Sequence, residues 1–254
     1  MMLPVPRRLF VLACAAIAAG VPVASAVGAD AASEQAPLAW AQRLVDETNP
    51  EETDYRHKDT TVTWKGSSGA RATISRTDCS GLVNAVLQRS YGWGPQQFQR
   101  WLGRTRPVAS SYHDAIDTER GFRRIAAVGE IQPGDLIAIR YPDGSPNSGH
   151  IMMVAGVPQA HPASAPAVAG TAQWTVEVID SSQSGHGNAD NRYLGNHRFR
   201  AGIGHGRLRL YADGAGRITG YSWSTQANSE YYTPDQRHLV VGRLVVPAVR
   251  DLKP

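Results

Sequence analysis

The sequence has little cysteine and almost no long apolar runs. Only 2 of its 254 residues are cysteine, which excludes a small disulfide-stapled fold. The one long uncharged apolar stretch lies at the extreme N-terminus, which excludes a multi-span membrane protein. Lys and Arg (26) barely outnumber Asp and Glu (22) and form no dense block, so nucleic acid is not supported as a partner. With 42% hydrophobic and 19% charged residues, the composition is that of one globular domain.

Residues 1–26 have the layout of an export signal. Two arginines at 7–8 precede an apolar stretch at 9–19, and residues 24–26 (Ala-Ser-Ala) fit an A-x-A cleavage site. The apolar stretch is too short to span a bilayer. The double arginine also resembles a twin-arginine signal, so the export route stays open. We expect the mature protein to work in the periplasm or outside the cell, without a stable membrane span.

The rest of the chain is expected to form a leader and a single domain. Residues 27–36 are small and polar, which is typical of a flexible leader. The domain is expected to span residues 37–254. It opens with a short amphipathic helix from Pro37 to about Asn49. The polar residues 51–76 are interpreted as loop.

Helical patterns come early in this domain and strand patterns late. Residues 77–81 are predicted to open a second helix, with Cys79 in its first turn and an apolar face formed by Leu82, Val83, Val86 and Leu87. Strands are predicted at Leu136–Arg140, His150–Val154, Trp174–Asp180, Arg207–Tyr211, Arg217–Trp223 and Leu239–Val246. This order predicts an α+β fold in which the Cys79 helix packs on an antiparallel sheet. Residues 199–247 are expected to add a C-terminal strand extension with an extra hairpin.

The scarcity of cysteine makes Cys79 informative. Removal of the signal would also remove Cys14 and leave Cys79 as the only thiol. A thiol reacts as its thiolate, which the N-terminus of a helix favours. Attack on a carbonyl also needs a histidine to carry the proton and a polar group to hold that histidine. His150 begins one predicted strand and Asp180 ends another, so antiparallel pairing would bring the three residues together.

Three short motifs resemble the NlpC/P60-type, papain-like cysteine peptidases and amidases. Residues 78–83 (DCSGLV) match the D-C-S-G-[LF]-V signature of that family, and this block is highly specific. Residues 133–136 (PGDL) and 149–151 (GHI) match its P-G-D-L and G-H-[IV] strands and are supportive. The resemblance extends over about residues 55–182.

The resemblance implies a papain-like fold and cleavage of peptide or amide bonds in bacterial cell-wall peptides. It implies Cys79 as the nucleophile and His150 as the base. The expected substrate is a peptidoglycan peptide or another peptide or amide. No cofactor and no metal is expected.

The sequence departs from the family pattern at three places. In one of them, residues 199–247 have no counterpart in the minimal family core, and no wall-binding repeat is visible. Many relatives carry His, Asn or Gln at the third catalytic position, whereas the matching strand here ends in Asp180. The usual Y-x-W-G-G stretch before the nucleophile is absent, and residues 55–57 (Tyr-Arg-His) occupy the comparable region. Tyr55 is therefore a candidate donor to the oxyanion. Asp78 and Ser80, which flank the nucleophile, are further candidates for substrate or oxyanion contacts.

Alternatives remain open for the activity. Cys, His and Asp in this order would also suit an acyl transferase of transglutaminase type. A third interpretation is a cell-envelope-binding module without turnover. Cys79 could then be a buried structural thiol, and Asp180 a carboxylate that caps a turn.

Other polar and aromatic residues carry weaker signals. His186 with Asp190 could bind a metal, but no paired ligand spacing accompanies them, so a solvated loop is favoured. The glycine-rich segment 202–206 resembles a phosphate-binding loop only in its glycine count, and a structural role is favoured. Aromatic residues that could stack on sugars, but more often belong to the core, are Tyr91, Trp93 and Trp101.

Overall fold

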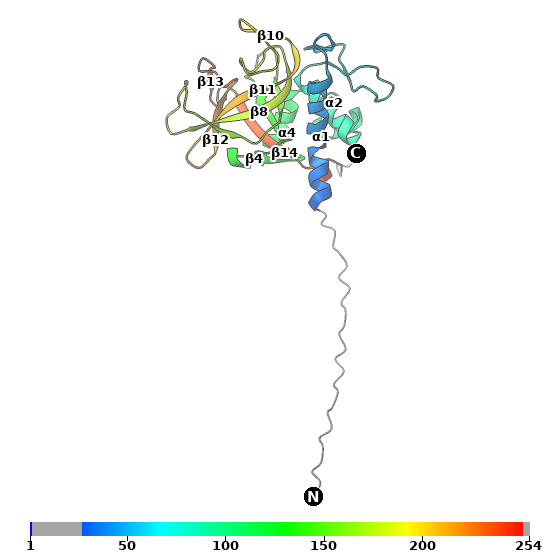
Figure 1. Cartoon of the computed structure of the whole chain (residues 1–254), viewed down its shortest axis with the longest axis horizontal. Helices are drawn as coiled ribbons and strands as arrows, with labels where there is room; N and C mark the ends of the chain where they lie inside the picture. Colours follow the sequence, from blue (N-terminus) through cyan, green and yellow to red (C-terminus); the bar gives the residue numbers. More distant parts are fainter. Residues whose placement is uncertain (2–26, 251–254) are drawn as a thin grey trace.

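The structure is a computed structural model that describes residue 1 and residues 27–250 (Figure 1). The predicted signal at 1–26 therefore lies outside the described residues, apart from Met1. Within the described part of the chain, no helix combines the length and apolar character that crossing a membrane requires. The fold is α+β, as predicted.

Helices occupy mainly the first half of the chain. They are α1 (Val27–Glu47), η1 (Pro50–Glu52), α2 (Cys79–Tyr91), α3 (Pro95–Leu102), α4 (Ala109–Asp117), η2 (Val128–Glu130) and α5 (Val246–Arg250). The prediction of a helix with Cys79 in its first turn is confirmed, since α2 begins at this residue. The prediction of a flexible leader at 27–36 is wrong, because α1 already begins at Val27 and continues through Pro37. The leader is rich in alanine and carries Glu and Gln, which favour helix.

Strands follow, with short ones also between α1 and α2. They are β1 (Thr53–Asp54), β2 (Thr61–Thr63), β3 (Ile74–Arg76), β4 (Phe122–Ile125), β5 (Leu136–Arg140), β6 (Gly149–Val154), β7 (Gln159–His161), β8 (Ala172–Ser182), β9 (Tyr193–Gly195), β10 (Arg198–Phe199), β11 (Gly202–Ala212), β12 (Ile218–Ser222), β13 (Tyr231–Tyr232) and β14 (His238–Leu244). All six predicted strands are present. The interpretation of 51–76 as loop missed β1, β2 and β3, which form a small sheet of their own.

The main sheet has nine strands and is antiparallel throughout. Its order is β13-β12-β11-β8-β6-β5-β14-β4, and β7 pairs with β8. The predicted hairpin between β11 and β12 is confirmed. Residues 199–247 are not an extension, however, because β14 lies between β5 and β4 inside the sheet. A strand with a neighbour on each side can pair its backbone N–H and C=O groups in both directions. The strand β14 is therefore integral to the fold.

Both faces of the main sheet are buried. In β5, Leu136 and Ala138 join an apolar cluster with residues of α1, α2, α3 and α4. Ile137 and Ile139 point to the opposite face and join a second cluster built mainly from strand residues. Figure 1 shows α1, α2 and α4 gathered on one side of β8 and β11. The helices therefore cover one face, and the sheet must cover its other face itself.

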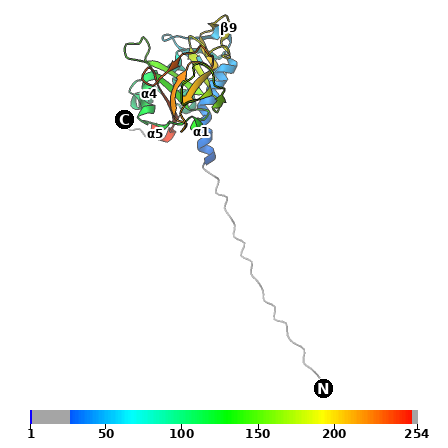
Figure 2. The same ribbon diagram turned by 90° about the vertical axis from the view of Figure 1, so that its left-hand side faces the viewer.

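The sheet covers that second face by curling until the segment after its edge strand β4 meets the start of β12. Ala127, after β4, forms a bridge with Arg217, before β12. On either side of this bridge, Val128 N–H donates to the Gly216 carbonyl at 2.9 Å, and Ile218 N–H donates to Ala126 at 3.1 Å. The second cluster thus lies inside a closed strand layer. Figure 2 shows α1 and α5 near one end of the molecule and β9 at the other.

Candidate active site

The N-terminus of α2 is organised by Asp78. This residue is the N-cap, and its Oδ1 accepts hydrogen bonds from Gly81 N–H at 2.6 Å and from Ser80 Oγ at 3.1 Å. Such a cap satisfies backbone donors that a helix start leaves unpaired. Cys79 is the first residue of the helix, is only 4% exposed, and lines a cleft. Asp78 and Ser80, predicted as substrate or oxyanion contacts, line the cleft. Their side chains hydrogen-bond each other as part of the helix cap.

Two further groups hold the Asp78 carboxylate. Its Oδ2 lies 2.9 Å from Arg106 Nη2 and 3.1 Å from His57 Nδ1. Burial raises the pKa of Asp78, but the Gly81 N–H, Arg106 and His57 outweigh burial and leave the pKa below its usual value. The cap is therefore ionised at neutral pH.

His150 lies at the start of β6, where the preceding residue must be glycine. Gly149 has a φ of +149°, and a Cβ there would lie 2.0 Å from the Ile139 carbonyl oxygen. His150 Nε2 is 2.6 Å from Asp180 Oδ2 on the neighbouring strand β8. The charge on the Cys79 side chain acts on the same ring. Because Nε2 is engaged by Asp180, Nδ1 is the ring nitrogen that remains available to the sulfur. The structure thus brings Cys79, His150 and Asp180 together.

The electrostatics of this group favour a charged imidazole. Burial lowers the pKa of His150, but the nearby Cys79 charge and the hydrogen bonds to Asp180 and Cys79 raise it to about 10. A thiolate beside an imidazolium is the reactive form of a cysteine nucleophile.

Thr77 joins the elements that carry these residues. Its N–H donates to the Asp54 carbonyl at 3.0 Å, just before Tyr55. Its own carbonyl accepts from Ser181 Oγ at 2.6 Å, just after Asp180. Ser181 is fully buried. The helix start, the Tyr55 segment and β8 are therefore fixed relative to one another through one residue that sequence reasoning did not single out.

Asp180 lies in a buried cluster of charged residues. His186 Nε2 is 3.1 Å from Asp180 Oδ2, and Arg192 Nη2 is 2.8 Å from Oδ1 as an ion pair without hydrogen-bond alignment. Arg192 also makes a bidentate pair with Asp190, at 2.9 and 2.7 Å. The preference for a solvated loop at His186 and Asp190 is wrong, because their exposures are only 0% and 4%. Carboxylate and cation neighbours let these polar side chains be buried.

This cluster determines the charge of Asp180. Burial raises the pKa of Asp180, but Arg192, His186 and the hydrogen bonds from both histidines hold it well below its usual value. Asp180 therefore remains ionised and can orient the His150 ring. An interpretation of Asp180 as a turn cap does not fit, because it lies within β8 and is fully buried.

The glycines of segment 202–206 make room for the cluster. Gly204 lies opposite Asp180 in the sheet, and a Cβ there would approach Arg192 Nε to 2.2 Å. At Gly206 a Cβ would lie 2.4 Å from Asp190 Oδ2. The segment is part of strand β11 rather than a loop. The structural role favoured from sequence is therefore confirmed, as a close approach of side chains to a strand backbone.

An open cleft passes over Cys79 and His150. One hollow of about 310 Å³ borders Cys79, and a second of about 330 Å³ borders His150. Both are lined by Tyr55, Asn147 and Gly149, so we treat them as two halves of one cleft. A chain that lay along both halves would pass the sulfur and the imidazole in turn.

Tyr55 lies at the junction of these halves. Burial raises its pKa, and the neighbouring Cys79 and Asp78 charges raise it further. The phenol therefore keeps its proton at neutral pH and can donate a hydrogen bond. Trp223 adds a wall beside His150, with ring centroids 4.9 Å apart, and stacks on His186 at 4.3 Å.

Comparison with known proteins relates this chain to a viral protein. The chain is 35% identical over 221 residues to "Uncharacterized protein R653" of Acanthamoeba polyphaga mimivirus, a match that covers 83% of this chain and 97% of the viral protein. The chain belongs to the R653 family. No protein-family model and no solved structure matches it.

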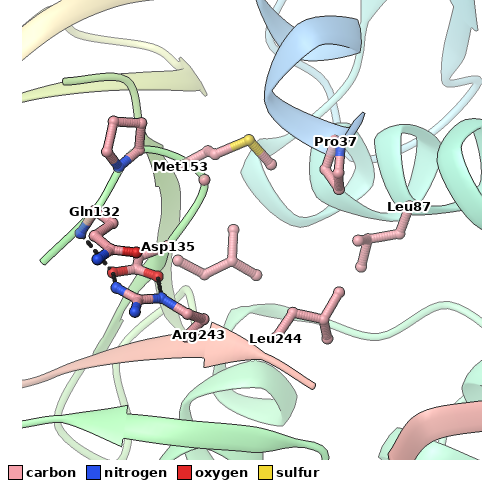
Figure 3. Close-up of a pocket in the computed structure, with 10 residues that line it drawn as sticks. Pro37, Leu87, Gln132, Asp135, Met153, Arg243 and Leu244 are labelled. Carbon is pink, nitrogen blue, oxygen red and sulfur yellow. Dashed lines mark hydrogen bonds and ion pairs between the residues drawn. The ribbon is translucent and has the colours of Figure 1, made fainter. Parts of the chain in front are cut away.

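This member of the R653 family also has a cavity away from Cys79. It measures about 170 Å³ and lies where β5 begins and β6 ends, at the opposite end of these strands from His150. Figure 3 shows Pro37, Leu87 and Leu244 around its apolar part, with Asp135 paired to Arg243 beside it. Asp135 of the PGDL motif therefore ties β5 to β14, at 2.8 Å, and does not reach the cleft.

Two other sequence interpretations concern stacking and metals. Trp93 and Trp101 are 5% and 0% exposed and belong to the helix-side core, where Tyr91 packs against them. The core interpretation of these aromatics is confirmed. Among residues 27–250, no group of three or more His, Cys, Asp or Glu side chains is arranged to hold a metal ion.

Proposed function

We propose that this protein is a thiol hydrolase of papain-like, NlpC/P60-type fold that cleaves peptide or amide bonds. One observation carries the proposal: His150 hydrogen-bonds an ionised, buried Asp180 and interacts electrostatically with Cys79, beside an open cleft. The DCSGLV motif at 78–83 supports the same assignment.

The geometry supports a two-step reaction. The Cys79 thiolate attacks the carbonyl carbon of the scissile amide, and the resulting oxyanion accepts hydrogen bonds from the Cys79 N–H and the Tyr55 hydroxyl. As the C–N bond breaks, His150 Nδ1 gives its proton to the departing amine, which leaves a thioester on sulfur. Water then loses a proton to His150 Nδ1 and attacks the thioester, which releases the acid and restores the Cys79 thiolate beside a protonated His150. Asp180 holds the ring throughout and keeps its charge.

We further propose peptidoglycan peptides as the substrate class and export as the route to them. The motif resemblance supports the substrate class. The arginines, apolar stretch and Ala-Ser-Ala site of residues 1–26 support export to the periplasm or beyond. Sequencing of the N-terminus of protein recovered outside the cytoplasm should give a chain that begins at Val27, whereas an intact Met1 there would contradict processing.

Replacement of Cys79 tests the proposed activity most directly. The mature protein and Cys79→Ala are incubated with muropeptides and with a panel of peptide and amide substrates, and products are identified by mass spectrometry. Wild type should release a free amine and a free acid, and the variant should be at least about 10³-fold slower, because no thioester can form.

A matched control and an added amine sharpen this experiment. His205→Gln, at a partly exposed position of β11, should act like wild type. Preferential formation of a new amide with the added amine would identify an acyl transferase instead. Equal inactivity of wild type and Cys79→Ala, together with a Cys79 that iodoacetamide does not modify at neutral pH, would contradict catalysis altogether.

A further inference from the structure

His186 has only hydrogen-bond acceptors around its ring. Nδ1 lies 2.8 Å from the carbonyl oxygen of Trp223, and Nε2 lies 3.1 Å from Asp180 Oδ2. A carbonyl can only accept a hydrogen bond, and so can an ionised carboxylate. Both ring nitrogens can satisfy these contacts only if both carry a proton, which makes the ring an imidazolium.

The charges of the buried cluster are balanced when His186 is positive. Asp180 and Asp190 supply two negative charges, and Arg192 supplies one positive charge. The imidazolium of His150 and the thiolate of Cys79 cancel each other and do not change this sum. All four side chains of the buried cluster are at most 4% exposed, so solvent cannot neutralise the remaining carboxylate charge. A cationic His186 completes the balance, and this agrees with the role of buried pairs in general.

We propose that His186 is a positioning residue, a buried imidazolium that shares Asp180 with His150 and limits how strongly His150 holds its proton. The inference rests on the proposed function, since it concerns the Cys79–His150 pair. His186 and His150 contact the same carboxylate oxygen. A positive charge at one ring opposes a positive charge at the other and favours a negative charge on sulfur.

Other ionisable groups also face the reacting pair, and they stay in place in the experiment below. They are Asp78 and Arg106 from the α2 side, Tyr55 from the β1 side, Tyr141 after β5, Tyr232 and Arg237 from the β13 side, and Asp190 and Arg192 from the segment after β8.

The test is the substitution His186→Gln. Glutamine keeps a donor to Asp180 but carries no charge. The rate of Cys79 alkylation by iodoacetamide is measured from acidic to strongly alkaline pH. Loss of the charge should move both midpoints of the profile to higher pH, by about half a unit or more, with the larger shift in the upper midpoint because His150 is nearer. His205→Gln should reproduce the wild-type profile.

Each outcome bears on a separate claim. Wild-type alkylation that depends on His150, combined with an unchanged profile in His186→Gln, would overturn the inference and leave the proposed function standing. A wild-type Cys79 that does not react would overturn the proposed function.

A second measurement does not depend on the variant folding. In ¹⁵N-labelled wild type, the His186 ring is assigned through its contacts with the stacked Trp223 indole. We expect both ring nitrogens to be protonated at neutral pH. An unprotonated nitrogen in that ring would overturn the inference.

Discussion

Asp78 and Asp180 are both ionised carboxylates next to the nucleophile, but they lie in different surroundings. The partners of Asp78 reach solvent, since the side chains of Arg106 and His57 are 42% and 55% exposed. Those of Asp180 that follow β8, His186 and Arg192, are 0% exposed. Water can replace a lost partner at Asp78 and cannot do so at Asp180. The same residue type is therefore a local cap in one place and part of a charge network in the other.

Removal of Arg192 should give the largest difference in stability between the surroundings of Asp180 and those of Asp78. Arg192→Met leaves Asp180 and Asp190 buried without their main cation, so the free energy of unfolding should fall by about 3–5 kcal/mol. Urea unfolding monitored by circular dichroism measures it. Arg106→Met is the matched control, and because Arg106 is a partly exposed partner of Asp78, it should cost about 1 kcal/mol or less. Similar losses in the two variants would contradict the distinction.

Acid should have a smaller effect on the unfolding free energy, and this effect should arise at Asp180. The pKa of Asp180 is held well below its usual value by Arg192 and His186, which overcome burial. A carboxylate with a lowered pKa stabilises the fold above its unfolded pKa, and this stabilisation disappears as the pH falls through the folded pKa. Wild-type unfolding free energy should therefore fall steeply below about pH 4.

Asp180→Asn supplies the matched measurement. Its unfolding free energy at neutral pH should be lower than that of wild type, and it should depend less on pH in the acid range. An acid dependence as steep as that of wild type would assign the effect to other carboxylates.

Loss of the cap at Asp78 should have the smallest effect. Asp78→Ala removes the acceptor for Gly81 N–H, so the unfolding free energy should fall by about 1 kcal/mol. Asp78→Asn keeps an oxygen that can cap the helix and should lie closer to wild type. If Asn and Ala cost the same, the cap geometry would not be the source of the stability.

Much of the site follows from short stretches of sequence. The cap and the start of α2 depend on Asp78 and its neighbours along the chain, so the pattern of residues 78–87 predicts where the helix begins. The β5, β6 and β8 strands follow from apolar runs, and their pairing was the one long-range assumption. That assumption was correct, and it brought His150 to Asp180.

Other features of the fold and the site could not be predicted from a local sequence pattern. His186 stands among Gly, Asn and Asp residues that usually mark a solvated loop, yet the structure buries it against Trp223. The position of β14 near the end of the sequence favours a C-terminal extension, but this strand pairs with β5 and β4 in the main sheet. The short strands β1 to β3 carry polar residues without a periodic apolar pattern. They are strands because they pair with one another in a small sheet.

Local sequence patterns specify the helix that presents Cys79 and the strands that carry His150 and Asp180, and they include the motifs that suggest thiol chemistry. These depend on periodicity and capping, which act over a few residues. The contacts of Asp180 with Arg192 and His186 are visible only in the folded chain, as is the close approach of this cluster to the glycines of β11. Burial of charges depends on which distant groups meet away from water, and no local pattern encodes that meeting.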